Sequence, residues 1–241
     1  MRTMAAVLIA SVAAVLSGCH IYNPSSGSET VQRPSAVMDF AALYGNNCAA
    51  CHGADGANGP AMDLANPEYQ ALVDDATLRK WIGGGMPGTQ MPAFAKSNGG
   101  MLTDAQVNAI IAGMRQRWSR PGALEGTQPP PYTDSRTGDA GRGAQTYQAR
   151  CAICHKQGRE DISSPVYLAL VSDQTFRTMI IAGSPDIGQP DWRHDSADGK
   201  LATPLSAQDI NDIIAYLDGL RNASPGFTGT ATASQSGAPA R

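Results

Sequence analysis

Apolar residues recur with helical spacing in two stretches of the chain that lie 103 positions apart. The positions are Val107, Ile110, Ile111 and Met114 in the first stretch and Ile210, Ile213, Ile214 and Leu217 in the second. Both follow the i, i+3, i+4, i+7 spacing of an amphipathic helix. A capping box from Thr103 to Gln106 precedes the first stretch, and the variant from Ser206 to Asp209 precedes the second. The pattern predicts two helices that are copies of one another.

Shorter helical segments repeat in the same order before these two helices, at offsets of 103 or 98 positions. They are 41–44 with 144–147, 66–73 with 164–171, and 77–79 with 175–177. No stretch shows the strict alternation that is typical of a strand. We therefore predict an all-α fold with two tandem helical domains.

Proline-rich and small-residue segments separate the predicted parts of the chain. A proline-rich run at 128–132 lies between the repeats, and Ala, Ser, Gly and Thr without periodicity follow the second repeat. The predicted division is a signal peptide 1–18, a flexible tether 19–36, domain 1 at 37–120, a linker 121–137, domain 2 at 138–222 and a disordered tail 223–241.

The amino terminus has the features of an export signal. Arg2 precedes a mostly apolar run at 5–16, which is short for a membrane span. The next residues, Leu16-Ser-Gly-Cys19, resemble a bacterial lipobox. The resemblance implies cleavage before Cys19 and lipidation of that cysteine, so that the exported protein is anchored to a membrane and faces the periplasm or the cell exterior. The alternative is an ordinary signal peptide with an unrelated cysteine.

Composition narrows the function classes further. The net charge is −3 and mean hydropathy is −0.24, which argues against a nucleic-acid binder with a basic face and against a multipass membrane protein. Aromatic residues make up only 6% of the chain, so each predicted domain has a thin apolar core. We expect that something other than side chains fills it.

The other four cysteines form two C-x-x-C pairs, and a histidine follows each pair directly. The two motifs are Cys48, Cys51 and His52, and Cys151, Cys154 and His155. C-x-x-C-H is the attachment signature of c-type haem, in which both thiols bind the haem covalently and the imidazole ligates the iron. The sequence predicts two haem c groups, without which we expect neither domain to be stable.

Three other roles of the cysteine pairs remain as alternatives. A four-cysteine zinc site leaves the two histidines unexplained. A thioredoxin-like redox pair requires a βαβ context that the pattern lacks. Two structural disulfides would each close a very short loop.

Residues 37–120 and 138–222 resemble class I cytochrome c domains in a tandem arrangement. The resemblance implies a methionine as the sixth iron ligand, on the loop between the haem motif and the last helix. Met91 in Met-Pro-Ala-Phe fits that role better than Met86. It also implies that a proline carbonyl orients the ligating histidine, which Pro60 would do in domain 1. In domain 2 the nearest candidate is Pro165, whose register relative to Pro60 is ambiguous.

The repeat places Gln189, not methionine, opposite Met91. His194, five residues later, is the tentative sixth ligand of haem 2. Ligation by Gln189 or water, or an open iron, remains an alternative. Met179 aligns with a helical position, which favours a packing role. Because a methionine ligand raises the potential of haem iron, we expect haem 1 to have the higher potential.

The predicted function is that of a membrane-anchored dihaem cytochrome c that transfers single electrons. Its partners would be another carrier and a membrane-bound respiratory or photosynthetic complex, of which it could be a subunit. No other residues form a catalytic set. If haem 2 is open, a haem enzyme of dihaem-peroxidase type or a gas-binding sensor is the alternative.

Overall fold

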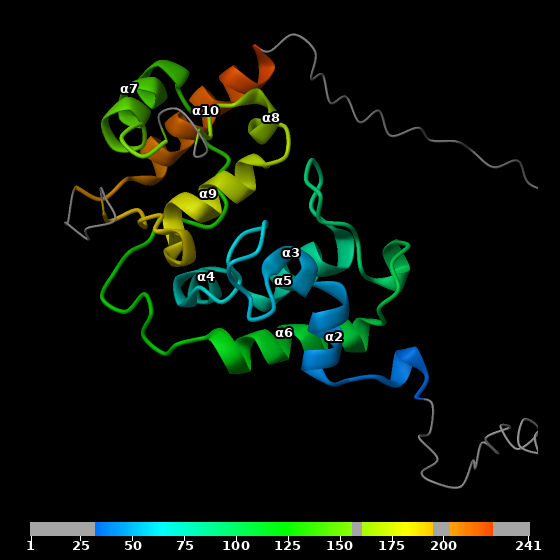
Figure 1. Ribbon diagram of the computed structural model, residues 1–241. Coiled ribbons are helices and arrows are strands. Elements are labelled where there is room, and N and C mark those ends of the chain that lie inside the picture. Colours follow the sequence, from blue (N-terminus) through cyan, green and yellow to red (C-terminus); the bar gives the residue numbers. More distant parts are fainter. Residues whose placement is uncertain (1–31, 156–160, 195–202, 224–241) are drawn as a thin grey trace, which may run out of the picture. The chain divides into compact units, whose positions relative to one another are not determined.

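The computed structural model describes residues 32–155, 161–194 and 203–223. The chain divides into two units, residues 1–36 and 37–241. In the first unit, the only described element is the short helix η2 (Pro34–Ala36). The signal peptide, Cys19 and the tail beyond Ala223 lie outside the described residues. Both repeated domains belong to the second unit, and every regular element described in it is a helix, which confirms the predicted all-α fold (Figure 1).

Domain 1 consists of five α-helices and a short 3-10 helix. They are α2 (Phe40–Asn47), α3 (Ala49–His52), α4 (Pro67–Leu72), α5 (Asp75–Gly84), η3 (Lys96–Asn98) and α6 (Asp104–Trp118). The predicted capping box of α6 is present, with both reciprocal hydrogen bonds between Thr103 and Gln106. The four predicted apolar positions of α6 are all buried. They form the centre of the domain 1 core, against which α2 packs.

The described part of domain 2, residues 138–155, 161–194 and 203–222, repeats this arrangement with fewer elements. They are α7 (Ala140–Arg150), α8 (Pro165–Leu168), α9 (Asp173–Ala182), η4 (Pro185–Ile187) and α10 (Ala207–Asn222). Helix α10 begins with the predicted capping box at Ser206 and Asp209. It crosses α7 closely, because a Cβ at Gly143 would lie only 1.8 Å from the carbonyl oxygen of Asp212. The same first-to-last helix packing therefore organises both domains (Figure 1).

The linker between the domains is bonded to both of them. Trp81 of α5 donates a hydrogen bond from Nε1 to the hydroxyl of Tyr132 at 3.0 Å. Gln174 and Arg177 of α9 donate to the carbonyl oxygens of Tyr132 and Pro131, each at 2.8 Å. The linker thus acts as a structural element and not only as a spacer.

A direct contact also joins the two domains, at α4 of domain 1 and the end of α9 in domain 2. Asn66, which caps α4, donates from Nδ2 to the carbonyl oxygens of Ala182 at 2.8 Å and Gly183 at 3.1 Å. Arg193 forms an ion pair with Glu68. Leu72 of α4 packs against the domain 2 core. The contact lies beside the loop that carries Gln189.

Candidate haem-binding sites

Each C-x-x-C-H motif follows the first helix of its domain directly, in the short helix α3 in domain 1 and on a turn in domain 2. In domain 1, Tyr44 of α2 donates from its hydroxyl to the carbonyl oxygen of Gly53 at 2.9 Å, just beyond the motif. In domain 2, the repeated residue Tyr147 donates to the carbonyl oxygen of His155 at 3.3 Å. Both tyrosines are buried. The repeated tyrosine therefore holds the end of the motif against the first helix in both domains.

The imidazole of His52 is oriented by a backbone carbonyl. Its Nδ1 lies 2.9 Å from the carbonyl oxygen of Met62, so the neutral ring donates from Nδ1 and keeps Nε2 for a metal. Burial lowers the pKa of His52, which favours this neutral form. The expectation that the Pro60 carbonyl accepts the hydrogen bond from His52 was wrong, because the acceptor is the Met62 carbonyl. Gly59 lies against the backbone of the haem motif, since a Cβ there would be 2.3 Å from the Cys51 carbonyl oxygen.

None of the four cysteines of the two motifs forms a disulfide. Burial raises the pKa of both Cys48 and Cys151 to about 11, so these thiols are protonated at neutral pH. Across residues 32–155, 161–194 and 203–223, no group of three or more His, Cys, Asp or Glu side chains could hold a metal ion. Neither the disulfide nor the four-cysteine zinc alternative gains support from this arrangement.

The loops expected to carry the sixth ligands have matching hydrogen bonds in the two domains. The backbone N–H of Met86 donates to the carbonyl oxygen of Met91 at 3.1 Å, and that of Ser184 donates to Gln189 at 3.0 Å. The next contact repeats too, from Leu102 to Phe94 at 2.8 Å and from Leu205 to Trp192 at 2.9 Å. Gln189 therefore has the backbone position in domain 2 that Met91 has in domain 1.

Glycine is required where each loop leaves the preceding helix. Gly85 and Gly183 have φ values of +74° and +70°, a region that favours glycine. A Cβ at Gly85 would lie 2.8 Å from the backbone nitrogen of Ala93, and one at Gly183 would lie 2.9 Å from the carbonyl oxygen of Gln189. The repeated glycine thus allows each loop to fold back closely on the helix end.

The candidate sixth ligands differ in their surroundings. Met91 is partly buried against the domain 1 core. In domain 2, Oε1 of Gln189 lies 3.2 Å from Nε2 of His155, the nitrogen that would bind iron. His194 instead pairs through Nδ1 with Oδ1 of Asp191 at 2.9 Å. Met179 lies within α9, in the helical position that the repeat predicts. The geometry therefore brings Gln189 and His155 together, in place of the expected pairing of His155 with His194.

An unsatisfied donor in domain 2 supports the fit of a haem. The indole Nε1 of Trp192 is buried and has no hydrogen-bond partner. Such orphaned donors are rare in proteins and indicate a missing partner, a role that a haem carboxylate can fill. Trp192 belongs to the same apolar cluster as Cys151. Together with His155 and the thiols of Cys151 and Cys154, it gives domain 2 a donor set that fits haem c. In domain 1, the thiols of Cys48 and Cys51 and the free Nε2 of His52 fit it equally.

Sequence reasoning missed two residues that shape these sites. The Met62 carbonyl orients His52, and the side chain of Asn66 joins α4 to the end of α9. The signal for Asn66 was visible only as an N-cap before a proline. Nothing in the periodicity indicated that its amide would also bond to the other domain.

Comparison with known proteins identifies both domains. Residues 35–112 match the family "Cytochrome C oxidase, cbb3-type, subunit III", and residues 140–221 match the family "Cytochrome c". The chain is also similar to dihydro-heme d1 dehydrogenase of Pseudomonas aeruginosa, with 40% identity over 77 residues. That alignment covers 31% of this chain and 14% of the relative. With its helical fold and two cytochrome c domains in succession, the chain belongs to the class I c-type cytochromes as a tandem, two-domain member.

Proposed function

We propose that this protein is a lipid-anchored dihaem cytochrome c that passes single electrons between a membrane-bound redox complex and another carrier. The observation that carries the proposal is the duplication of a complete haem-attachment motif in two domains that are bonded to each other. Haem c would supply the one-electron chemistry. The chain would supply the thiols that attach each haem and the histidine that ligates its iron.

The contact between the domains favours electron transfer from one haem to the other. Asn66, the N-cap of α4, and Glu68 and Leu72 within α4 all contact domain 2. The linker is bonded to α5 and α9. A fixed contact keeps the separation of two redox centres constant, so an electron can pass between them without a diffusional encounter. Met91 in one domain and Gln189 in the other would give the haems different potentials, with haem 1 the higher.

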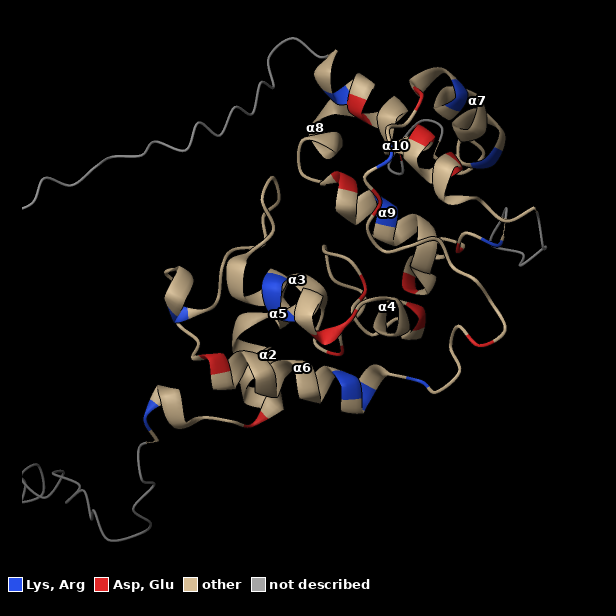
Figure 2. Ribbon diagram, turned by 180° about the vertical axis from the view of Figure 1, so that it is seen from behind, with Lys and Arg blue, Asp and Glu red and all other residues tan. Residues whose placement is uncertain are grey.

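The proposed partner is a respiratory complex in the membrane. Domain 1 matches the family of subunit III of a cbb3-type cytochrome c oxidase, which supports a role beside or within such a complex. The sequence has only four lysines, and in Figure 2 the basic residues are dispersed over several helices. A ring of lysines that would steer the protein to an acidic partner is therefore not the basis of recognition.

Membrane attachment would depend on Cys19. None of the described helices is long and apolar enough to cross a membrane. The proposal predicts that the exported protein sediments with membranes and that its mass includes acyl groups bound to Cys19. An exported protein whose Cys19 carries no acyl group would contradict the lipid anchor.

Mass spectrometry and a redox titration of the purified protein test the main proposal. The expected mass exceeds that of the polypeptide by two haems, and the titration should resolve two one-electron steps at different potentials. A protein without haem, or two coincident high-potential steps, would contradict it. The relative named dihydro-heme d1 dehydrogenase aligns over too little of its length to support the same activity here.

A further inference from the structure

We propose that the iron of haem 2 is a binding site for a small neutral diatomic ligand, with Gln189 as the residue that faces the bound ligand. The inference rests on the proposed attachment of haem at Cys151 and Cys154. It adds a ligand-binding role to domain 2, whereas domain 1 would keep the closed ligation expected for an electron carrier.

Gln189 is the residue that faces the iron-binding nitrogen of His155. Because Oε1 of Gln189 lies 3.2 Å from Nε2 of His155, this side chain occupies the side of the imidazole on which the iron would bind. An amide oxygen is a hard and weak ligand for ferrous iron, in contrast to the thioether sulfur of a methionine. Gln189 therefore leaves the sixth position available to an exogenous ligand.

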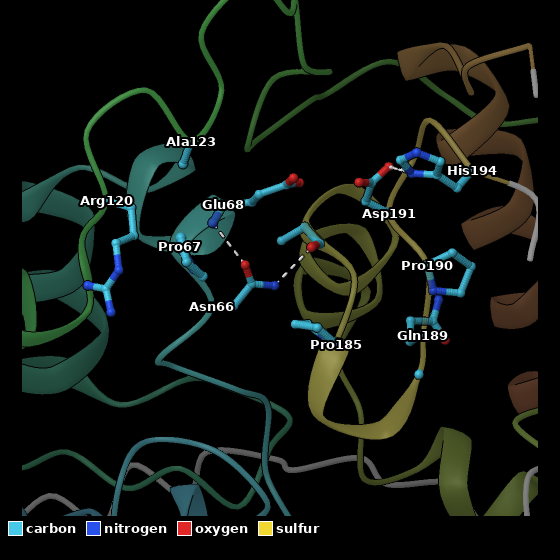
Figure 3. A pocket seen from close by; sticks show the side chains of 12 residues that line it. Asn66, Pro67, Glu68, Arg120, Ala123, Pro185, Gln189, Pro190, Asp191 and His194 are labelled. Atoms are coloured by element: carbon cyan, nitrogen blue, oxygen red, sulfur yellow. Dashed lines mark hydrogen bonds and ion pairs between the residues drawn. The ribbon is translucent and has the colours of Figure 1, made fainter. Parts of the chain in front are cut away.

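His194, the competing protein ligand, is held by a neighbouring carboxylate. Its Nδ1 is bonded to Asp191, and the side chain of Asp191 also accepts from the backbone N–H of Arg193 at 2.7 Å. Arg193 is in turn paired with Glu68 of α4. These contacts hold His194 in its place beside Asp191 (Figure 3). Gln189 and not His194 therefore lies opposite His155.

Residues of domain 1 support the loop of domain 2 that carries Gln189. The bonds from Asn66 fix the loop at Ala182 and Gly183, before Gln189. The backbone N–H of Asn58 donates to Oδ2 of Asp186 at 2.9 Å, and Glu68 holds Arg193 after Gln189. Contacts on both sides of Gln189 resist the loop movement that would bring another side chain to the iron.

Gln189 also offers polarity to a bound ligand. The side-chain NH₂ of glutamine can donate a hydrogen bond to a bound diatomic ligand, and such donors in the distal pocket tune ligand affinity. Carbon monoxide is a suitable probe because it binds only to a ferrous iron with an available position.

The test is a carbon monoxide titration of the reduced holoprotein, followed by optical and infrared spectroscopy. We expect one of the two haems to bind carbon monoxide in the parent protein. Gln189→Met should lower the affinity at least tenfold, because the sulfur closes the site. Gln189→Leu should keep binding but raise the carbon monoxide stretching frequency, because the hydrogen bond is lost. His194→Ala tests the competing ligand and should bind no more tightly than the parent, and the matched control is Met101→Gln, because Met101 is 82% exposed.

The outcomes separate this inference from the proposed function. A parent protein that carries two haems but binds no carbon monoxide would overturn the ligand site and leave the electron-transfer proposal intact. Carbon monoxide binding that appears only in the His194→Ala variant would identify His194 as the sixth ligand of haem 2. That result would also overturn the proposed ligand site. A mass that lacks the second haem would overturn both proposals.

Discussion

The side-chain amide of Asn66 in domain 1 donates a hydrogen bond to the carbonyl oxygen of Ala182 in domain 2 at 2.8 Å. The same amide group reaches the Gly183 carbonyl, while its Oδ1 accepts the backbone N–H groups of Glu68 and Tyr69. Asn66 is only 3% exposed. One buried side chain thus starts α4, ends α9 and joins the two domains.

Asn66→Ala should lower the free energy of unfolding of the holoprotein by about 2 to 4 kcal/mol, since it removes a helix cap and leaves buried carbonyl oxygens without a donor. Denaturant unfolding measures the loss. The repeat supplies a matched control, because Ser164 has the equivalent position in domain 2 and its side chain makes no capping bond. Ser164→Ala should cost less than about 0.5 kcal/mol. Equal losses in the two variants would contradict the joining role of Asn66.

The two candidate sixth ligands invite a reciprocal exchange. Met91→Gln should lower the potential of haem 1, and Gln189→Met should raise that of haem 2, each by more than about 59 mV, which is tenfold in a one-electron equilibrium. A redox titration measures both changes. Met101→Gln is the control, because Met101 is 82% exposed and should leave both potentials unchanged. A fall in potential with Met86→Gln, but not with Met91→Gln, would assign the ligand to Met86.

Much of the fold followed from the repeat in the sequence. The helical spacing around Ile110 and Ile213 predicted the last helix of each domain, and the start signals at Thr103 and Ser206 marked its first turn. These features are local, since a cap and an amphipathic face depend on residues within a few turns of one another. The haem-attachment motifs are equally local, and so are their positions at helix ends.

The contacts that set the environment of each haem could not be predicted in this way. The Met62 carbonyl was missed because the length of a loop does not determine which of its carbonyls approaches His52. The pairing of His194 with Asp191 depends on the conformation of one turn. The joining role of Asn66 depends on the packing of two domains, and the similar Ser164-Pro165 segment makes no such bond.

Asp63 gives the protein a pH-dependent stability term. It is buried beside Asp186, and burial followed by the charge of Asp186 raises its pKa. The folded state therefore holds this proton more tightly than the unfolded state, and stability falls as pH rises from the ordinary carboxyl pKa of about 4 through the raised value. Asp63→Asn should be more stable than the parent at neutral pH, by an amount that shrinks below about pH 4. Thermal unfolding across this range checks it, and a variant that is less stable at neutral pH would contradict the effect.

The glycines at the end of α5 separate backbone strain from helix propensity. Gly85→Ala should lower the free energy of unfolding by about 1 to 3 kcal/mol, because its φ of +74° and its close approach to the Met91 carbonyl oxygen exclude a Cβ. The neighbouring Gly84→Ala is the matched control, since a Cβ there meets no atom within 4 Å. It should be neutral or stabilising by up to about 1 kcal/mol. Because Gly85 positions the Met91 loop, Gly85→Ala should also weaken the near-infrared band of methionine-ligated ferric haem, which Gly84→Ala should preserve. Loss of that band in both variants would mean that the loop depends on α5 as a whole and not on the conformation of Gly85.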